Sequence, residues 1–243
     1  MTEITEDGFL DGRVRLRQFS RGFRSGLDAM MLAASVPAGE RETVLELGSG
    51  AGAASLCVAT RVPDCMITGV DIHRELVALA NENACANGMG SRARFVQADV
   101  LNLPTKLRTP FDHVLCNPPF HDSLGETSPD EARAQALQDF GDLPGWLETG
   151  VKRTASGGTL TVILRADRLT EALDGLPNHG VSVFPLWPKR DVPAKRVLIQ
   201  LRRGKRAPLA LLSGLVLHEN DGRYTPEADA ILRSGAPLPF GTP

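Results

Sequence analysis

The segment Asn117-Pro118-Pro119-Phe120 is well suited to holding an amino group. Its two prolines fix φ and remove two backbone donors, so the segment is stiff and its carbonyl groups are left to accept hydrogen bonds. The side-chain oxygen of Asn117 and the carbonyl oxygen of Pro118 can accept from both N–H groups of a planar amine. Phe120 offers a face on which a flat ring can stack, typically worth about 1–3 kcal/mol for a base. The competing interpretation is a proline-rich loop that only closes a strand.

A second chemical signal is a glycine-rich turn between an apolar run at 43–47 and a predicted helix. Gly48, Gly50 and Gly52 permit a sharp bend and a close approach of backbone to a ligand at a helix N-terminus. The spacing fits G-x-G-x-G. With Ala53 in the last place it also fits the dinucleotide pattern, which keeps a nicotinamide-dependent oxidoreductase open as an alternative.

Acidic side chains follow two further predicted strands. Asp71 ends the run at 66–70, where its carboxylate can accept both ribose hydroxyl protons of an adenosine-containing ligand. Asp99 follows the run at 94–97 and can accept from an adenine amino group. The alternatives are a helix cap for Asp71 and a solvated turn for Asp99. Ligands of open α/β sheets bind where parallel strands end, so we expect both acids at one edge.

The pattern along the chain alternates strands with helices, which predicts a mostly parallel sheet covered on both faces. A short hairpin with its turn at Asp11-Gly12 precedes this region, and a turn is expected at Gly157-Gly158. The predicted strands are 43–47, 66–70, 94–97, 112–116, 159–164, 181–184 and 196–201. The predicted helices are 29–34, 53–61, 73–87 and 129–140, with another around Trp146.

The composition excludes several classes of protein. Lys and Arg number 27 against 29 Asp and Glu, a net charge of −2, so the chain is not a polycation. No apolar run reaches the roughly 18 residues of a membrane span, and the acidic N-terminus lacks the core of a secretory signal. The four cysteines form no C-x-x-C pair and the histidines show no ligand spacing. We therefore expect a cytoplasmic protein without a metal site.

Positive charge is concentrated in two places. Residues 13–24 contain five arginines and no acid, and residues 189–206 contain eight Lys or Arg and only Asp191. Two basic clusters on a net-acidic chain predict a basic face that binds a nucleic-acid backbone. Either cluster alone can also be the solvated surface of an edge strand.

Taken together, these motifs resemble the S-adenosylmethionine-dependent methyltransferases of the seven-stranded class. The carriers of this resemblance are Glu46 to Gly52, Asp71 and the Asn-Pro-Pro-Phe segment, whose form is similar to that of the amino-group methylating branch. The segment 21–28, with Leu32-Ala33, resembles the lead-in of the bacterial tRNA1(Val) (adenine-N6)-methyltransferase family. The segments 195–200 and 217–225 resemble its C-terminal signature.

The resemblance implies a Rossmann-like sheet of order 3-2-1-4-5-7-6 with the last strand antiparallel. It implies a hairpin and helix extension over residues 1–38, a methyltransferase domain over 39–233 and a flexible tail over 234–243. It also implies an enzyme that methylates N6 of an adenine in a tRNA anticodon loop. A protein-glutamine methyltransferase is the alternative, because an amide nitrogen presents the same two N–H groups.

The residue roles that follow from the resemblance divide into a cofactor set and an acceptor set. Arg24 and Asp28 are expected to close the cofactor pocket, with an ion pair or helix cap as their alternative. Glu46 is expected to anchor the cofactor, with an internal hydrogen bond as its alternative. The residues expected to bind S-adenosyl-L-methionine are Arg24, Asp28, Glu46, Gly48, Gly50, Gly52, Asp71, Ile72, Asp99, Val100 and Asn117. The residues expected to act in catalysis are Asn117, Pro118, Pro119 and Phe120.

Overall fold

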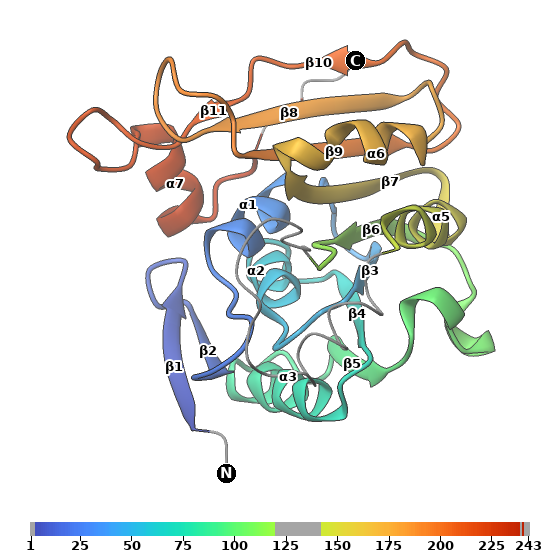
Figure 1. The fold of residues 1–243 in the computed structure, drawn as a ribbon. Helices are drawn as coiled ribbons and strands as arrows, with labels where there is room; N and C mark the ends of the chain where they lie inside the picture. The colour runs from blue at the N-terminus through green and yellow to red at the C-terminus, as the bar shows by residue number, and fades with distance from the viewer. Residues whose placement is uncertain (1–2, 120–141, 239, 241–243) are drawn as a thin grey trace, which may run out of the picture.

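A computed structural model describes residues 3–119, 142–238 and 240 (Figure 1). Its centre is a sheet of nine described strands in the order β10-β8-β9-β7-β6-β3-β4-β5, with β11 also paired to β8. The strands are β3 (Thr43–Leu47), β4 (Met66–Asp71), β5 (Ala93–Gln97), β6 (Phe111–Cys116), β7 (Thr154–Arg165), β8 (Val181–Trp187), β9 (Arg196–Arg202), β10 (Ala210–Leu211) and β11 (Leu215–Val216). If β3 is counted as strand 1 and β9 as strand 7, the strands from β5 to β8 have the expected order 3-2-1-4-5-7-6. Strand β9 is antiparallel to both of its neighbours.

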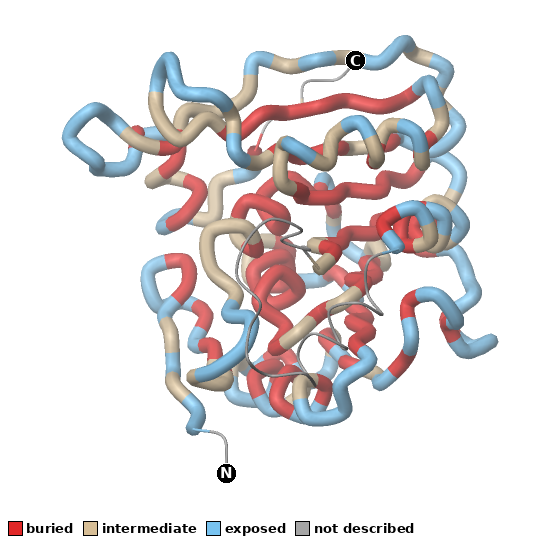
Figure 2. The backbone as a smooth tube through the Cα atoms, in the orientation of Figure 1, coloured by how far each residue is buried: buried red, intermediate tan, exposed pale blue. Residues whose placement is uncertain are grey.

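The strands are buried on both faces because their apolar side chains alternate between two hydrophobic clusters. In β3, Val44 packs into one cluster while Leu45 and Leu47 pack into the other. Helices α1, α2 and α3 contribute to the first cluster, and α5 and α6 to the second. Figure 2 shows this buried interior running through the sheet and its covering helices. The two-sided burial explains why the strands are nearly continuous apolar runs in the sequence.

The described helices agree with the sequence pattern where that pattern was long. Helices α2 and α3 were predicted to within one residue at each end, and the helix around Trp146 is α5. The short α6 and the C-terminal α7 were not predicted, and the segment 129–140 lies outside the described residues. The described helices are α1 (Leu27–Ser35), α2 (Ala53–Arg61), α3 (Arg74–Ala86), α5 (Leu143–Arg153), α6 (Leu169–Asp174) and α7 (Pro226–Ser234).

The N-terminal hairpin packs beside α2 and α3 (Figure 1). It consists of β1 (Ile4–Phe9) and β2 (Val14–Phe19), and the apolar side chains of Val14 and Leu16 are fully buried. The expected turn is present, but it is longer than the predicted pair Asp11-Gly12, because Phe9 pairs with Val14 across four connecting residues. The buried Leu10 occupies one of them. The hairpin therefore shares the hydrophobic core of the sheet domain.

The turn expected at Gly157-Gly158 is a bulge inside β7. The register against β6 jumps between Phe111 and His113, and both glycines stay within the strand. A Cβ on Gly158 would lie 2.2 Å from the carbonyl oxygen of Asp112, so only glycine permits this approach of the two backbones. A pair of glycines occurs in turns and in bulges alike. Here the pairing of β7 with β6 makes it a bulge.

Beyond α7 the chain returns to the body of the molecule. Leu238 is buried, and its N–H donates to the carbonyl oxygen of Ala34 at 2.8 Å. The ring of Phe240 lies 5.3 Å from that of Phe184, measured between centroids. The division of the chain at residues 38 and 233 remains a prediction. No helix among the described residues combines the length and the apolar character that a membrane crossing requires.

Candidate functional site

A cleft of about 680 Å³ opens where strands β3, β4, β5 and β6 end. Because these strands are parallel, their carboxyl ends meet at one edge, and the loops that follow them line the cleft. The expected site residues that the cleft brings together are Glu46, Gly48, Gly50, Asp71, Ile72, Asp99, Val100, Asn117, Pro118 and Pro119. Arg24, Asp28 and Gly52 are not among its lining residues, and Phe120 lies outside the described residues.

The turn after β3 and the carboxylate after β4 are joined by hydrogen bonds. Asp71 is buried, and it accepts from the N–H of Gly50 at 2.9 Å and from the N–H of His73 at 2.9 Å. Gly50 has φ 53°, and a Cβ there would meet no atom within 4 Å, so the space beside it is open. The neighbouring Ser49 hydroxyl is buried, and it has no hydrogen-bond partner in the described part of the chain. This turn therefore leaves room and an unmet polar group for a ligand.

Gly52 has a packing role in the structure. Its φ of 89° is left-handed, and a Cβ there would lie 2.8 Å from the ring of Phe95. The absence of a side chain lets the start of α2 approach β5. Of the three glycines in the turn, Gly48 and Gly50 line the cleft and Gly52 lies behind it.

Glu46 lies at the floor of the cleft, with 4% of its surface exposed. Its Oε2 accepts from the N–H of Ser55 at 3.0 Å and from the Ser55 hydroxyl. Burial raises the pKa of Glu46 to about 8, although the hydrogen bonds from Ser55 oppose the rise, and the charge of Asp71 adds to it. Glu46 thus makes the internal hydrogen bond that was its alternative role, and it also lines the cleft.

Asp99 lies in an exposed turn and also lines the cleft, and its contact with an adenine remains a prediction. Its Oδ1 accepts from the N–H of Leu101 at 2.8 Å and caps a short 3₁₀ turn over Val100–Asn102. The residue is exposed and lines the cleft beside Val100. The apolar Ile72 and Leu101 also form part of the lining. A flat apolar ring with a polar edge fits between such groups.

The acceptor segment after β6 lies in the same cleft as the glycine turn. The side-chain Oδ1 of Asn117 is buried and has no hydrogen-bond partner among the residues that the structure describes. A buried acceptor without a donor costs about 1–3 kcal/mol. A ligand that donates a hydrogen bond to this oxygen would remove that cost. Arg168, at the start of α6, donates from Nη1 to the carbonyl oxygen of Pro119 at 3.4 Å and pairs with Glu171 at 2.8 Å. Arg168 therefore fixes the far end of the proline pair.

Arg24 and Asp28 are engaged in ion pairs outside the cleft lining. Arg24 Nη2 lies 2.6 Å from Asp7, and Arg196 Nε lies 2.9 Å from Asp28. The first pair joins the segment before α1 to the hairpin. The second joins α1 to β9. Of the two alternatives that the sequence left open for these residues, the structure displays the ion pair.

Several cleft residues were missed by sequence reasoning. The segment between β2 and α1 contributes Arg21 and Phe23, and α5 contributes Trp146. Phe23 lies within the segment 21–28 that resembles the family's lead-in, but the sequence predicted no role for its side chain. Trp146 reaches the cleft only because α5 packs behind the glycine turn, where a Cβ on Gly48 would lie 2.6 Å from its ring. No spacing in the sequence carries that information.

Most arginines of the first basic cluster are used within the protein. Arg13 donates to the carbonyl oxygens of Leu10 and Arg233, Arg17 pairs with Glu82, and Arg24 pairs with Asp7. Arg15 and Arg21 are exposed. Arg21 is the one that lines the cleft, and it has no ion-pair partner within the described part of the chain.

The second basic cluster is divided between two opposite edges of the sheet. Strand β9 begins at Arg196, opposite Arg165, and ends at Arg202, opposite Thr159. Its length separates the two ends by about 20 Å at 3.4 Å per residue. Because β9 is antiparallel to β7, residues 189–196 lie at the end of the strands where the cleft opens, although none of them lines it, and residues 202–206 lie at the opposite end. Across residues 3–119 and 142–238, no group of three His, Cys, Asp or Glu side chains could hold a metal ion.

Comparisons with known proteins agree with this geometry. The methyltransferase small domain family matches residues 24–141. A tRNA1(Val) (adenine(37)-N6)-methyltransferase of Vibrio campbellii is 33% identical over 217 residues, which cover 86% of this chain and 89% of that protein. A protein of the same name from Aeromonas hydrophila is 29% identical over 205 residues, which cover 82% of this chain and 84% of that protein.

Among solved structures, a predicted O-methyltransferase from Agrobacterium tumefaciens superposes with a TM-score of 0.72. It is 25% identical in sequence, and the match covers 86% of this chain and 96% of that chain. The description of that protein differs from those of the sequence relatives in the atom that receives the methyl group. The acceptor must therefore be argued from the cleft.

Proposed function

The chain belongs to the family of tRNA1(Val) (adenine(37)-N6)-methyltransferases, and from this premise we propose that it methylates the exocyclic N6 amine of an adenine in a tRNA anticodon loop. S-adenosyl-L-methionine is its cofactor. The observation that carries the proposal is the buried Asn117 Oδ1, which has no donor within residues 3–119 and 142–238 and lies in one cleft with the glycine turn.

The residues of the cleft fit this cofactor. The open space at Gly50 and the unpartnered Ser49 hydroxyl would receive its methionine portion, and Glu46 would lie near its ammonium group. Asp71 would accept from the ribose hydroxyls, because each of its oxygens uses only one lone pair on the backbone. Ile72, Val100 and Leu101 would enclose the adenine ring, and Asp99 would accept at its edge. When bound, the cofactor supplies an electrophilic methyl group on a sulfonium centre.

The acceptor segment would act on the amine that receives this methyl group. The lone pair of an exocyclic amine is delocalised into the ring, so the free amine is a poor nucleophile. Asn117 Oδ1 and the Pro118 carbonyl, accepting from the two N–H groups, would hold the nitrogen in line and favour its tetrahedral form. Positioning of this kind supplies much of the acceleration without a strong base. The methylated nitrogen then loses a proton to solvent.

A planar amine with two N–H groups fits this cleft better than a hydroxyl, which brings a single donor to two acceptors. Glutamine amides meet the same requirement, so substrate type rests on the family and on the surface around the cleft. Methyl transfer to bulk tRNA, compared with transfer to bulk protein, separates the two. Mass spectrometry of the methylated RNA then identifies the nucleotide. Since tRNA is processed in the cytoplasm of bacteria, we place the protein there.

The decisive variant is Asn117→Ala, compared with Asn117→Asp, which keeps an acceptor oxygen at this position. The alanine variant should lose methyl transfer, while its affinity for S-adenosylhomocysteine stays within about tenfold because the other groups expected to bind the cofactor are left in place. The aspartate variant should retain measurable transfer. Unimpaired turnover in Asn117→Ala would overturn the assignment.

The proposed tRNA surface is the cleft-side half of the second basic cluster together with Arg21. Charge reversal at the exposed Arg190 and Lys195 should weaken tRNA binding and reduce its salt dependence by about 1.5 logarithmic units per unit of log salt. Reversal at Arg202 and Arg206 is the matched control, because these exposed residues carry the same charge at the far edge. Equal loss in both double variants would refute the cleft-side assignment.

A further inference from the structure

Phe23 stands at the rim of the cleft with 69% of its surface exposed. It is the most exposed aromatic residue that the structure describes. Leaving an aromatic ring in water forgoes its burial, which is commonly worth about 1.5–3 kcal/mol. The cleft below it contains the polar groups already described. An apolar ring held at the entrance to such a cleft calls for a partner with a flat apolar face.

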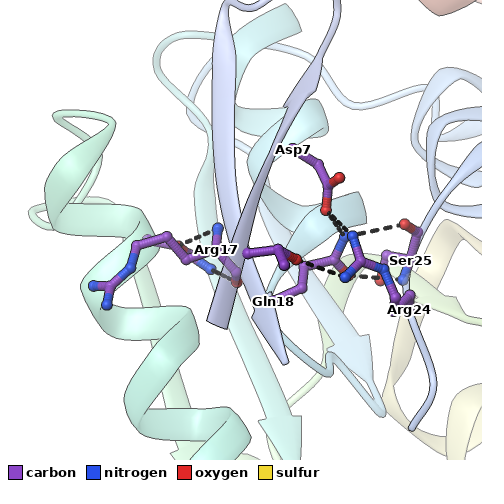
Figure 3. A network of polar contacts seen from close by, with 7 residues as sticks. Asp7, Arg17, Gln18, Arg24 and Ser25 are labelled. Atoms are coloured by element: carbon purple, nitrogen blue, oxygen red, sulfur yellow. Dashed lines mark hydrogen bonds and ion pairs between the residues drawn. The ribbon is translucent and has the colours of Figure 1, made fainter. Parts of the chain in front are cut away.

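The segment that presents Phe23 is held against the hairpin by the two residues that follow it, Arg24 and Ser25. Arg24 donates to Asp7 and to the Thr5 hydroxyl, each at 2.6 Å. The buried Gln18 donates to Asp7 at 2.9 Å and to the Ser25 carbonyl, and it accepts from the Ser25 N–H at 2.8 Å. Figure 3 shows Asp7, Gln18, Arg24 and Ser25 converging on one side of the hairpin. The ring next to Arg24 is thus carried by a stiff support.

The charge near this ring indicates which class of partner it binds. Arg21 is exposed two residues before Phe23 and lines the same cleft. A flat apolar face joined to an anion is the chemistry of a nucleotide in single-stranded RNA. A base that enters the cleft must leave its stack, and the neighbouring base then also loses a stacking partner. An aromatic side chain at the rim can replace that partner.

We propose that Phe23 stacks on the base next to the target adenine, and that Asp7, Gln18 and Arg24 are positioning residues for this contact. The neighbouring base is chosen because the ring is exposed, whereas Asn117 Oδ1, which lines the same cleft, is buried. The proposal rests on the proposed function and deepens it. It also gives the hairpin a part in substrate binding.

The first experiment compares Phe23→Ala and Phe23→Trp with Leu211→Ala. Leu211 is the matched control, because it is 71% exposed, lies on β10 and does not line the cleft. With an anticodon-loop RNA, Phe23→Ala should raise KM by about 5- to 150-fold, the range of base–aromatic stacks. Phe23→Trp and Leu211→Ala should stay near wild type, and the affinity for S-adenosylhomocysteine should not change in any of the three.

The second experiment removes the base from the RNA. An abasic nucleotide next to the target adenine should raise KM for the wild type and should abolish the difference between wild type and Phe23→Ala. Asp7→Asn should raise KM for the intact RNA, although the change removes a negative charge and by charge alone would strengthen RNA binding. In a Phe23→Ala background, Asp7→Asn should have no further effect.

The outcomes separate this inference from the proposed function. If the wild type methylates no RNA adenine, the proposed function is wrong. If the wild type is active and Phe23→Ala equals it, the stacking inference is wrong. Weaker binding of S-adenosylhomocysteine in Phe23→Ala would also overturn the inference, because it would assign the ring to the cofactor. An undiminished Phe23→Ala effect on the abasic RNA would overturn it as well.

Discussion

Cofactor binding should be coupled to proton release at Glu46. This carboxyl is buried, and burial together with the charge of Asp71 raises its pKa to about 8 against the hydrogen bonds from Ser55. In the free protein at about pH 7 it is therefore mostly protonated. The ammonium group of a cofactor bound at the glycine turn favours the ionised form, so binding should lower the pKa and expel the proton.

The size of this coupling follows from linkage. If the pKa of Glu46 falls from about 8 to below 6 on binding, the Kd should decrease roughly 25-fold between about pH 6.5 and pH 8.5. In the free protein, the contribution of Glu46 to the stability of the fold falls with rising pH, whereas the affinity for the cofactor rises. A carboxyl whose folded-state pKa is raised stabilises the fold below the ordinary value of 4.5, and this stability is lost as the pH rises through about 8.

Isothermal titration with S-adenosylhomocysteine measures the Kd and the number of protons released on binding. Titrations at about pH 7 in two buffers of different ionisation enthalpy should report about nine-tenths of a proton released per ligand. The Glu46→Gln variant keeps an acceptor for Ser55 and cannot ionise, so it should release none and should lose the pH dependence that is not the ligand's own. The same proton release in both proteins would refute the role of Glu46.

Three further predictions concern other parts of the chain. Gly52→Ala should destabilise the fold by about 1–3 kcal/mol more than Gly88→Ala in chemical denaturation, because both positions are left-handed but only the Cβ at Gly52 meets a ring; equal losses would contradict the packing role. Burial opposes ionisation of Glu42, but its hydrogen bonds from the Gly39 N–H and from His113 lower its pKa, so the stability that Glu42 contributes exists above pH 4.5 and disappears in acid. The stability difference between wild type and Glu42→Gln, followed by thermal unfolding, should therefore shrink as the pH falls, and a constant difference would exclude the ionised carboxylate of Glu42 as its source. Arg168→Met should lower kcat by about 10- to 100-fold with little change in cofactor affinity, because Arg168 fixes the Pro119 carbonyl; a loss confined to cofactor binding would contradict that role.

The fold could be predicted from the sequence where burial leaves a periodic record. The strands are apolar on both faces and were recognised as short runs, and α2 and α3 have long patterns. Helix α7 also carries readable signals, because Thr225 caps Ala228, Pro226 opens the first turn and Gly235 ends it at φ 65°. The two-residue strands β10 and β11 are too short to have a period. They exist because β8 offers an edge for pairing.

The site could be predicted to the extent that topology alone assembles it. Glu46, Asp71 and Asn117 belong to strand ends, and parallel strands bring such ends together whatever the details of packing. Arg24 and Asp28 depend instead on partners distant in sequence, Asp7 and Arg196, and no spacing specifies these pairs. The rim residues depend on how the hairpin and α5 pack against the sheet.

The antiparallel β9 explains how one basic stretch can serve a site at only one edge of the sheet. A parallel strand in its place would bring its last residues, the basic group after Arg202, to the cleft. Because β9 runs the other way, its first residue lies there, and Arg196 is neutralised by Asp28 of α1. The loop before β9 then supplies the remaining cations at the cleft, while the basic group after the strand faces the opposite side. Charge counted along the sequence therefore overstates the charge near the cleft, and strand direction decides which part of it a substrate can meet.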